Sequence, residues 1–146
     1  MSRILVTGAT GFIASHIIKL FLDEGHLVKA TVRNLNDKRI ELLKSLDKNE
    51  KLELVEAELL DFNSIEKATK DIDIVIHTAT TVNLNPIDDQ SVLRPSIDGT
   101  MNVLSAAFKS NVKRLVYTSS SFSVTGHEIE NRLYTDRDWA DVIFLF

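Results

Sequence analysis

A glycine-containing turn near the start of the chain has the residue types and spacing of a pyrophosphate-binding site. Gly8 and Gly11 follow the apolar run Ile4 to Val6, and an amphipathic helical pattern begins at once. Gly8 allows the turn to close, Gly11 lets the backbone approach phosphates, and Ala14 takes the third small position, where a helix packs on a strand. Backbone N–H groups and the positive end of the helix dipole then face the anion. The turn predicts a dinucleotide site, against the alternative of a strand–helix turn that binds no ligand.

Cationic residues after the second apolar run indicate which dinucleotide would bind. Arg33 lies 25 residues beyond Gly8, where an acidic residue would accept from the ribose 2′-OH of NAD and an arginine suits the 2′-phosphate of NADP. The alternative is that Arg33 is a solvated residue at a strand end. Lys38 and Arg39 either add positive charge to the site or form an ordinary helix face. The sequence favours NADP(H).

Three further polar segments follow apolar runs. Glu58 and Asp61 stand where an adenine ring could be reached, although Asp61 is equally a helix cap. Small residues from Thr78 to Thr80 would let the backbone pass close to a dinucleotide, and His77 is interpreted as a packed strand histidine rather than a base. Hydroxyls in the run 119–121 would lie where a substrate carbonyl sits, although such a run is also typical of a polar loop. The histidines show no metal-ligand spacing, so no metal site is expected.

The elements that must position these residues alternate between strand and helix. Strand patterns cover residues 3–7, 27–32, 52–56, 72–79 and 114–118. Helix patterns run from about Gly11 to Glu24, begin near Asp37, follow a cap at Asn63 or Ser64, and open at Pro95 after a loop over residues 80–91. Residues after Ser119 have no regular pattern. This alternation predicts an α/β fold, a doubly wound parallel sheet of the Rossmann type with strand order 3-2-1-4-5.

Composition narrows the function classes. The chain has 146 residues, a net charge of −4 that is spread along the sequence, and no cysteine. No basic face predicts nucleic-acid binding, and no apolar run approaches the roughly 18 residues that span a membrane. The absence of cysteine excludes a disulfide framework and fits a cytoplasmic protein.

Together these segments resemble the extended short-chain dehydrogenase/reductase superfamily, and most closely its dihydroflavonol 4-reductase and cinnamoyl-CoA reductase branch. The resemblance is carried by residues 6–15, 30–33, 57–61, 75–80, 99–104 and 112–120. It implies bound NADP(H) and hydride transfer to or from a carbonyl or hydroxyl carbon of a small molecule.

The resemblance also assigns roles to individual residues. It places Gly8, Phe12 and Ile13 on the pyrophosphate, and Arg33 on the 2′-phosphate. It places Glu58 and Leu59 on the adenine, and Thr78, Ala79 and Thr80 on the nicotinamide side. Ser120 corresponds best to the family's catalytic serine, with Ser119 the second choice.

The chain departs from the family pattern at the general acid. The family uses a Tyr and a Lys four residues apart, but Tyr117 precedes Ser121 and Tyr134 precedes Asp138 at that spacing. The sequence is therefore expected to be an NAD(P)-binding Rossmann domain over residues 1–146, ending before a sixth strand, with 119–146 irregular and no substrate domain. Three functions remain open: a portion of a carbonyl reductase that is inactive alone, a non-catalytic NADP(H)-binding module or pseudoenzyme, and a nucleotide-sugar epimerase or dehydratase relative. Arg33 favours a carbonyl reductase over a nucleotide-sugar epimerase or dehydratase relative.

The fifth strand pattern has consequences for association. With no sixth strand beside it, the segment Arg114 to Thr118 becomes a sheet edge that invites another strand. The apolar run Val142 to Phe146 has no evident core of its own. We expect the tail to cover the fifth strand or the chain to self-associate through that edge.

Overall fold

Five parallel strands form the centre of the molecule. In the computed structural model, which describes residues 1–81, 90–126 and 131–140, they are β1 (Arg3–Thr7), β2 (Leu27–Val32), β3 (Leu52–Glu56), β4 (Ile74–His77) and β5 (Arg114–Tyr117). Their order is β3-β2-β1-β4-β5, and every adjacent pair is parallel. The predicted fold class and strand order are confirmed.

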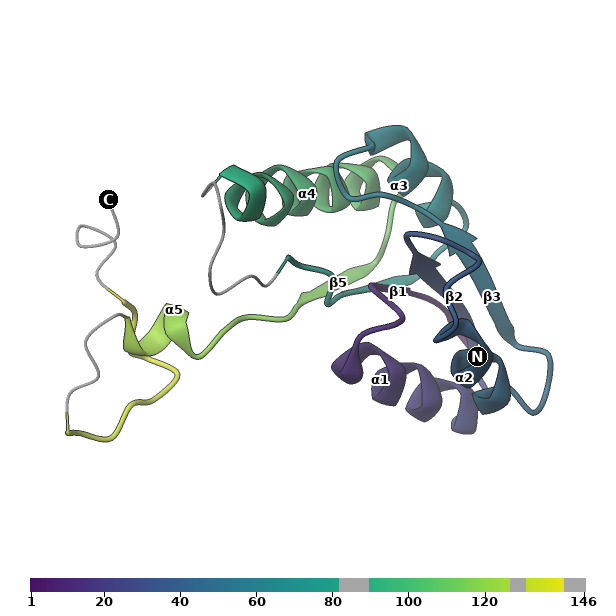
Figure 1. Cartoon of the computed structure of the whole chain (residues 1–146), viewed down its shortest axis with the longest axis horizontal. Helices are drawn as coiled ribbons and strands as arrows, with labels where there is room; N and C mark the ends of the chain where they lie inside the picture. The colour runs from purple at the N-terminus through teal and green to yellow at the C-terminus, as the bar shows by residue number, and fades with distance from the viewer. Residues whose placement is uncertain (82–89, 127–130, 141–146) are drawn as a thin grey trace.

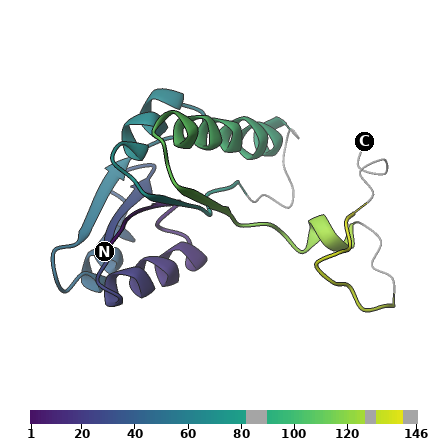
Figure 2. The same cartoon turned by 180° about the vertical axis from the view of Figure 1, so that it is seen from behind.

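Helices cover both faces of this sheet (Figures 1 and 2). One layer contains α1 (Phe12–Asp23) and α2 (Ile40–Leu46), and the other contains α3 (Phe62–Thr69) and α4 (Gln90–Lys109). Alternate residues of β1 serve the two cores: Ile4 and Val6 pack with Ile18 of α1, whereas Leu5 packs with Val103 of α4. The central strand is therefore buried on both sides, as a parallel sheet requires.

Three helix boundaries differ from the sequence-based expectation. Helix α4 begins at Gln90, so Pro95 lies inside the helix instead of opening it. A proline lacks the N–H that an interior helical position donates, which is why the sequence favoured a start there. Helix α2 begins at Ile40, after a turn. The cap of α3 is Asp61, whose carboxylate accepts from the Asn63 N–H at 3.0 Å.

The segment after β5 was expected to be irregular and contains a short helix, α5 (Phe122–Thr125). This helix and residues 131–140 lie away from the sheet in both views (Figures 1 and 2). Within residues 131–140, Asp138 links two neighbouring residues: its carboxylate accepts from Arg132 at 2.6 Å and from the Thr135 N–H at 2.7 Å. These bonds lower the pKa of Asp138 to about 2. The apolar run Val142 to Phe146, expected either to cover the fifth strand with the rest of the tail or to leave that edge to self-association, lies outside the described residues.

Candidate nucleotide-binding site

A cavity of about 350 Å³ lies at the carboxyl ends of the strands, the edge at which open α/β sheets bind ligands. It collects nine of the residues singled out from the sequence: Gly8, Gly11, Arg33, Arg39, Glu58, Leu59, Thr78, Ala79 and Thr80. Its other lining residues are Thr10, Thr31, Val32, Ala57, Thr81 and Pro95. Phe12, Ile13, Lys38 and Ser120 are not part of this lining. The segments at the carboxyl ends of β1, β2, β3 and β4 thus meet at one hollow.

Gly8 fixes the turn after β1 in two ways. Its φ is +71°, a backbone conformation that disfavours other residues, and a Cβ there would lie 2.9 Å from the Cα of Ala79. The turn therefore packs directly against the chain that leaves β4. Thr31 of β2 holds it from the other side, since its Oγ1 accepts from the Gly8 N–H at 3.2 Å and its carbonyl accepts from the Ala9 N–H at 2.9 Å.

The start of α1 supplies the N–H groups for an anion. Gly11 is the N-cap, and no side chain caps this helix. The amides of Gly8 and Ala9 already donate to Thr31 of β2, and the amide of Gly11 donates to the Gly8 carbonyl at 2.9 Å. The amides of the first helical turn, beginning with Phe12 and Ile13, have no intrahelical acceptor. Anion binding would therefore fall on these amides and on the helix dipole.

A buried hydrogen-bond network joins β1, β4 and α4 beneath the cavity. The Thr7 hydroxyl accepts from the N–H groups of Thr78 and Ala79, both at 3.1 Å, and lies 2.7 Å from Nδ1 of His77. A hydroxyl has one proton, so Thr7 donates it to Nδ1, and Nε2 carries the imidazole proton. Nε2 then donates to the Thr100 hydroxyl at 3.3 Å. The network fixes the backbone of residues 78–79. Sequence reasoning missed it because its members are far apart in the chain.

Burial sets the ionisation of His77. The side chain is almost completely buried, and this burial lowers its pKa to about 4 by disfavouring the charged imidazolium. His77 is therefore a neutral structural histidine, as the sequence interpretation held.

The two arginines of the cavity differ in their partners. Arg39 donates from Nη2 and Nε to the Asp37 carboxylate at 2.6 and 3.0 Å, and these bonds lower the pKa of Asp37 to about 2. Arg33 is exposed and forms no ion pair within the described part of the chain. Lys38 is also exposed but lies outside the cavity lining. Arg33 is thus the stronger attractor for an anion, and Asp37 neutralises part of the Arg39 charge.

Helix α4 holds the loop that would face an adenine. Asn102 donates to the Leu59 carbonyl at 2.8 Å, and a Cβ on Gly99 would lie 2.9 Å from the Cβ of Leu59. Ser64 completes the loop by accepting from the Glu58 N–H at 3.0 Å. The position of Leu59 in the cavity therefore depends on two residues of α4, the small Gly99 and the side-chain amide of Asn102.

Ser120 is exposed and lies at the start of α5. Its hydroxyl accepts from the Phe122 N–H at 3.3 Å, and the neighbouring Ser119 hydroxyl lies 2.9 Å from that of Ser123. The Ser120 proton remains available to an acceptor. The serine run leaves the sheet beside β4, where the Tyr117 ring lies 5.4 Å from that of His77.

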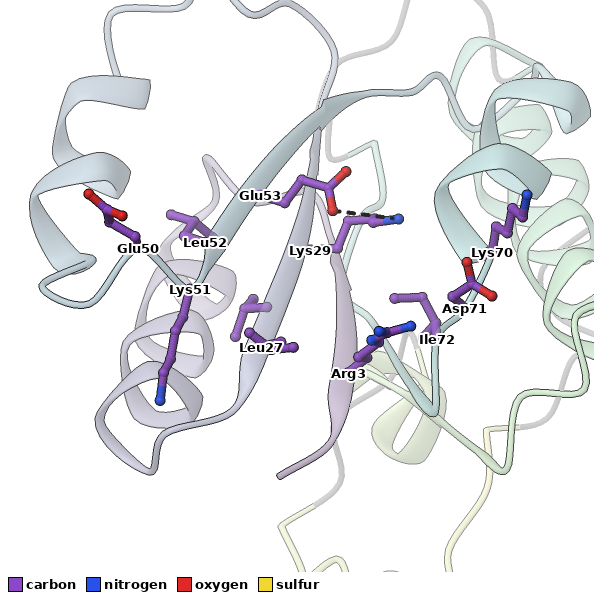
Figure 3. Close-up of a pocket in the computed structure, with 11 residues that line it drawn as sticks. Arg3, Leu27, Lys29, Glu50, Lys51, Leu52, Glu53, Lys70, Asp71 and Ile72 are labelled. Carbon is purple, nitrogen blue, oxygen red and sulfur yellow. Dashed lines mark ion pairs between the residues drawn. The ribbon is translucent and has the colours of Figure 1, made fainter.

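A second hollow, of about 380 Å³, lies at the amino ends of β1, β2 and β3 (Figure 3). One of its half-buried cations, Lys29, is paired with Glu53 at 3.7 Å. Because ligands of such sheets bind at the opposite edge, and because this charge is already paired, the carboxyl-edge cavity is the better candidate.

Residues 1–81, 90–126 and 131–140 give no support for a metal site or for a membrane-spanning helix. No group of three or more His, Asp or Glu side chains there is placed to hold a metal ion. No helix in these ranges combines the length and apolar character needed to cross a bilayer.

Comparisons with known proteins agree with this geometry. The model of the 3-beta hydroxysteroid dehydrogenase/isomerase family matches residues 5–139. Cinnamoyl-CoA reductase 1 of Petunia hybrida is 42% identical over 118 residues, which cover 80% of this chain and 34% of the relative. A dihydroflavonol 4-reductase/flavanone 4-reductase of Pyrus communis is also among the relatives. The expected relationship to the reductase branch of the short-chain dehydrogenase/reductase superfamily is confirmed.

Solved structures extend the likeness. Vestitone reductase from alfalfa superposes with a TM-score of 0.79 at 34% identity, covering 99% of this chain and 44% of that protein. Yeast methylglyoxal/isovaleraldehyde reductase, solved in complex with NADPH, superposes with a TM-score of 0.78 at 27% identity. The match covers 94% of this chain and 44% of the yeast protein. The chain thus spans less than half the length of these proteins.

Proposed function

The chain belongs to the 3-beta hydroxysteroid dehydrogenase/isomerase family, and on that premise we propose that it is the NADP(H)-binding portion of an oxidoreductase that reduces a carbonyl group. One observation carries the proposal: Arg33 lines the same cavity as Gly11, the N-cap of α1, which no side chain caps. The first helical turn that follows Gly11 offers N–H groups for a pyrophosphate, and Arg33 offers a guanidinium for a 2′-phosphate. Support for the cofactor also comes from the yeast reductase solved with NADPH.

Each part of the cavity has a task in this proposal. The first-turn amides of α1 bind the pyrophosphate, and Arg33, helped by Arg39, binds the 2′-phosphate. Glu58 and Leu59 border the adenine, and the backbone of residues 78–80 borders the nicotinamide. When bound, NADPH supplies a hydride to the substrate carbonyl carbon. The Ser120 hydroxyl donates to the carbonyl oxygen and holds it in place.

Cofactor selectivity tests the proposal. A charge-assisted hydrogen bond to a phosphate contributes about 1.5–3 kcal/mol, so NADPH should bind about tenfold or more tightly than NADH. In calorimetric titrations, Arg33→Ala should remove this preference and leave NADH affinity nearly unchanged. Arg137→Ala, an exposed arginine outside the cavity, is the matched control and should change neither affinity. Equal or tighter binding of NADH by the unaltered chain would refute the proposal.

Turnover by the 146-residue chain distinguishes a catalytic from a binding role. The sequence has no Tyr followed four positions later by Lys, so no side chain of the family's kind delivers the proton. General acid–base assistance is worth about 10²–10⁴-fold in rate. We expect the purified chain to bind NADPH and to reduce no aldehyde or ketone detectably. Robust reduction that disappears in Ser120→Ala would show instead that the chain is catalytic by itself.

A further inference from the structure

Helix α4 supports the nucleotide cavity at several points along its length. Pro95 of this helix lines the cavity. Further along, α4 contacts the loop that follows β3 and the segment that follows β4, and both of these carry lining residues. The contacts come from four residues that are not part of the lining themselves: Ser96, Gly99, Thr100 and Asn102. One helix thus reaches two sides of the same cavity.

Two of these residues hold the loop after β3, on the side of the cavity that would face an adenine. The Asn102 amide donates to the Leu59 carbonyl at 2.8 Å in a partly buried position. Gly99 leaves room for Leu59, because a Cβ at position 99 would lie 2.9 Å from the Leu59 Cβ. Both the backbone and the side chain of Leu59 are therefore placed by α4. We call Gly99 and Asn102 the adenine-side clamp.

The other two residues hold the segment that leaves β4. The Thr100 hydroxyl accepts from Nε2 of His77 at 3.3 Å. The Ser96 hydroxyl gives its proton to the Val92 carbonyl at 2.8 Å, so the Thr80 hydroxyl, 3.3 Å away, donates to Ser96. The segment is thus tied to α4 at its first and its last residue. We call Ser96 and Thr100 the nicotinamide-side clamp.

The two clamps lie in neighbouring rows of α4. At 3.6 residues per turn, the adenine-side clamp and Pro95 fall in one row. The nicotinamide-side clamp falls in the next row, about 100° around the helix axis. Val103, which is fully buried in the core, lies between the two rows. This buried side chain fixes the rotation of the helix, and the rotation directs the two rows to different parts of the cavity.

We propose that α4 positions the two halves of the cofactor separately. The adenine-side clamp sets Leu59 against the adenine, and the nicotinamide-side clamp sets the backbone of residues 78–80 against the nicotinamide. The inference rests on the proposed function, which names the two sides of the cavity. The members of both clamps are positioning residues, because they act through residues of the cavity lining and do not belong to it.

The hydrogen bonds around each clamp support this separation. The loop after β3 is also held by Ser64, which accepts from the Glu58 N–H at 3.0 Å. The segment after β4 is also held by Thr7, which accepts from the N–H groups of Thr78 and Ala79 at 3.1 Å. Within the described part of the chain, α4 is the element that bonds to both segments. A change in one clamp should therefore disturb one half of the site and leave the other half in place.

Two readouts separate the halves of the cofactor. Affinity for adenosine 2′,5′-bisphosphate, measured by calorimetry, reports the adenine half, and nicotinamide fluorescence at saturating NADPH reports the other half. Asn102→Leu removes the donor to Leu59 and should weaken bisphosphate binding about tenfold, with the fluorescence of bound NADPH nearly unchanged. Gly99→Ala should act in the same direction. Because alanine favours a helix more than glycine does, that loss cannot come from a weakened α4.

Changes in the nicotinamide-side clamp should give the opposite pattern. Thr100→Val keeps the shape of the side chain but offers no oxygen to His77. Bisphosphate affinity should stay nearly unchanged, whereas the fluorescence of bound NADPH should shift toward that of free NADPH. Ser96→Ala, at a partly exposed position, should behave alike and provides the test where Thr100→Val does not fold. Ser105→Ala, an exposed position of α4 outside both clamps, is the matched control and should change neither readout.

The possible outcomes distinguish this inference from the proposed function. Failure of the unaltered chain to bind NADPH would overturn both. NADPH binding with the same nicotinamide fluorescence as free NADPH would overturn the two clamps alone. Equal losses at both halves in every clamp variant, or no change in any of them, would do the same and leave the cofactor proposal standing. The crossed pattern, with each clamp affecting its own half, is the result that supports separate positioning by α4.

Discussion

One row of side chains crosses the sheet from its centre to its edge and becomes steadily more exposed. Val6 of β1, Ile76 of β4 and Val116 of β5 are neighbours in register, with exposed fractions of 0%, 7% and 45%. All three lie in short apolar strands that end in polar residues, so their local sequences are alike. The difference arises because α1 and α2 cover the centre of this face and do not reach β5. Burial here depends on neighbouring elements more than on the strand itself.

The two ends of the row also differ in how the chain leaves the strand. After β1 the turn is held by Thr31, by Ala79 and by the start of α1. After β5 the chain forms a four-residue helix whose hydrogen bonds are mostly local. The centre of the sheet therefore positions a rigid binding turn, and the edge does not.

Gly8→Ala should show the largest effect, because it disturbs the most enclosed turn. The new Cβ would meet Ala79 at 2.9 Å while the backbone keeps a φ of +71°. Left-handed backbone costs about 1–2 kcal/mol and overpacking about 1–3 kcal/mol, so the free energy of unfolding should fall by about 2–5 kcal/mol. Urea denaturation measures the change. Gly126→Ala, also at positive φ but with the nearest atom, the Ala140 Cβ, at an ordinary contact distance of 3.5 Å, is the control and should cost less.

The buried histidine near the centre should make stability depend on pH. His77 has a pKa of about 4 when folded and about 6.5 when unfolded, so below pH 6.5 the unfolded chain binds a proton that the folded chain does not. The free energy of unfolding should fall by about 1.4 kcal/mol per pH unit between about 6.5 and 4, and by about 3 kcal/mol in total.

Denaturant unfolding at several pH values tests this dependence. His77→Asn keeps an acceptor near the position of Nδ1 but cannot titrate, so its profile should be flat in that window. Asp37 and Asp138, with folded pKa values of about 2, contribute only as the pH falls through about 4 and below. A flat profile for the unaltered chain between pH 7 and 4.5 would be incompatible with a neutral, buried His77.

Two valine-to-alanine substitutions measure directly how burial differs between the two ends of the row. Val6→Ala removes two buried methyl groups and leaves a cavity, so it should cost about 2 kcal/mol. Val116→Ala removes the same atoms from a partly exposed strand and should cost less than about 1 kcal/mol. Equal losses in urea denaturation would show that the edge is covered in solution.

The sequence was informative where the signal is local. Alternating apolar runs and the Gly8–Gly11 turn predicted all five strands, their order and most of the cavity lining. It was less informative where a residue acts through a distant partner. The Thr7–His77–Thr100 network, the contact of Gly8 with Ala79 and that of Gly99 with Leu59 all join residues more than twenty positions apart. No periodicity or motif encodes such pairs.

Two errors in the predicted elements have local causes. Pro95 suggested a helix start because its ring is best tolerated in a first turn, yet α4 extends five residues before it. The short helix α5 was missed because a run of serines offers side-chain bonds that compete with helical ones. For the cap of α3 the sequence offered Asp61 as well as Asn63 or Ser64, and the structure confirms Asp61.

The smallest effect on folding, and the clearest on association, should come from a charge at the exposed end of the row. Val116 is 45% exposed, so Val116→Lys should change the free energy of unfolding by no more than about 0.5 kcal/mol. A lysine on an edge strand opposes pairing with another strand, because docking would bury its charge. We expect the isolated chain to self-associate with rising concentration in light scattering and the variant to remain monomeric. A chain that is monomeric at every concentration, with slow amide exchange at β5, would mean that its own residues already cover the edge. The difference in exposure between the centre of the sheet and the β5 edge would then apply to the described residues and not to the whole chain.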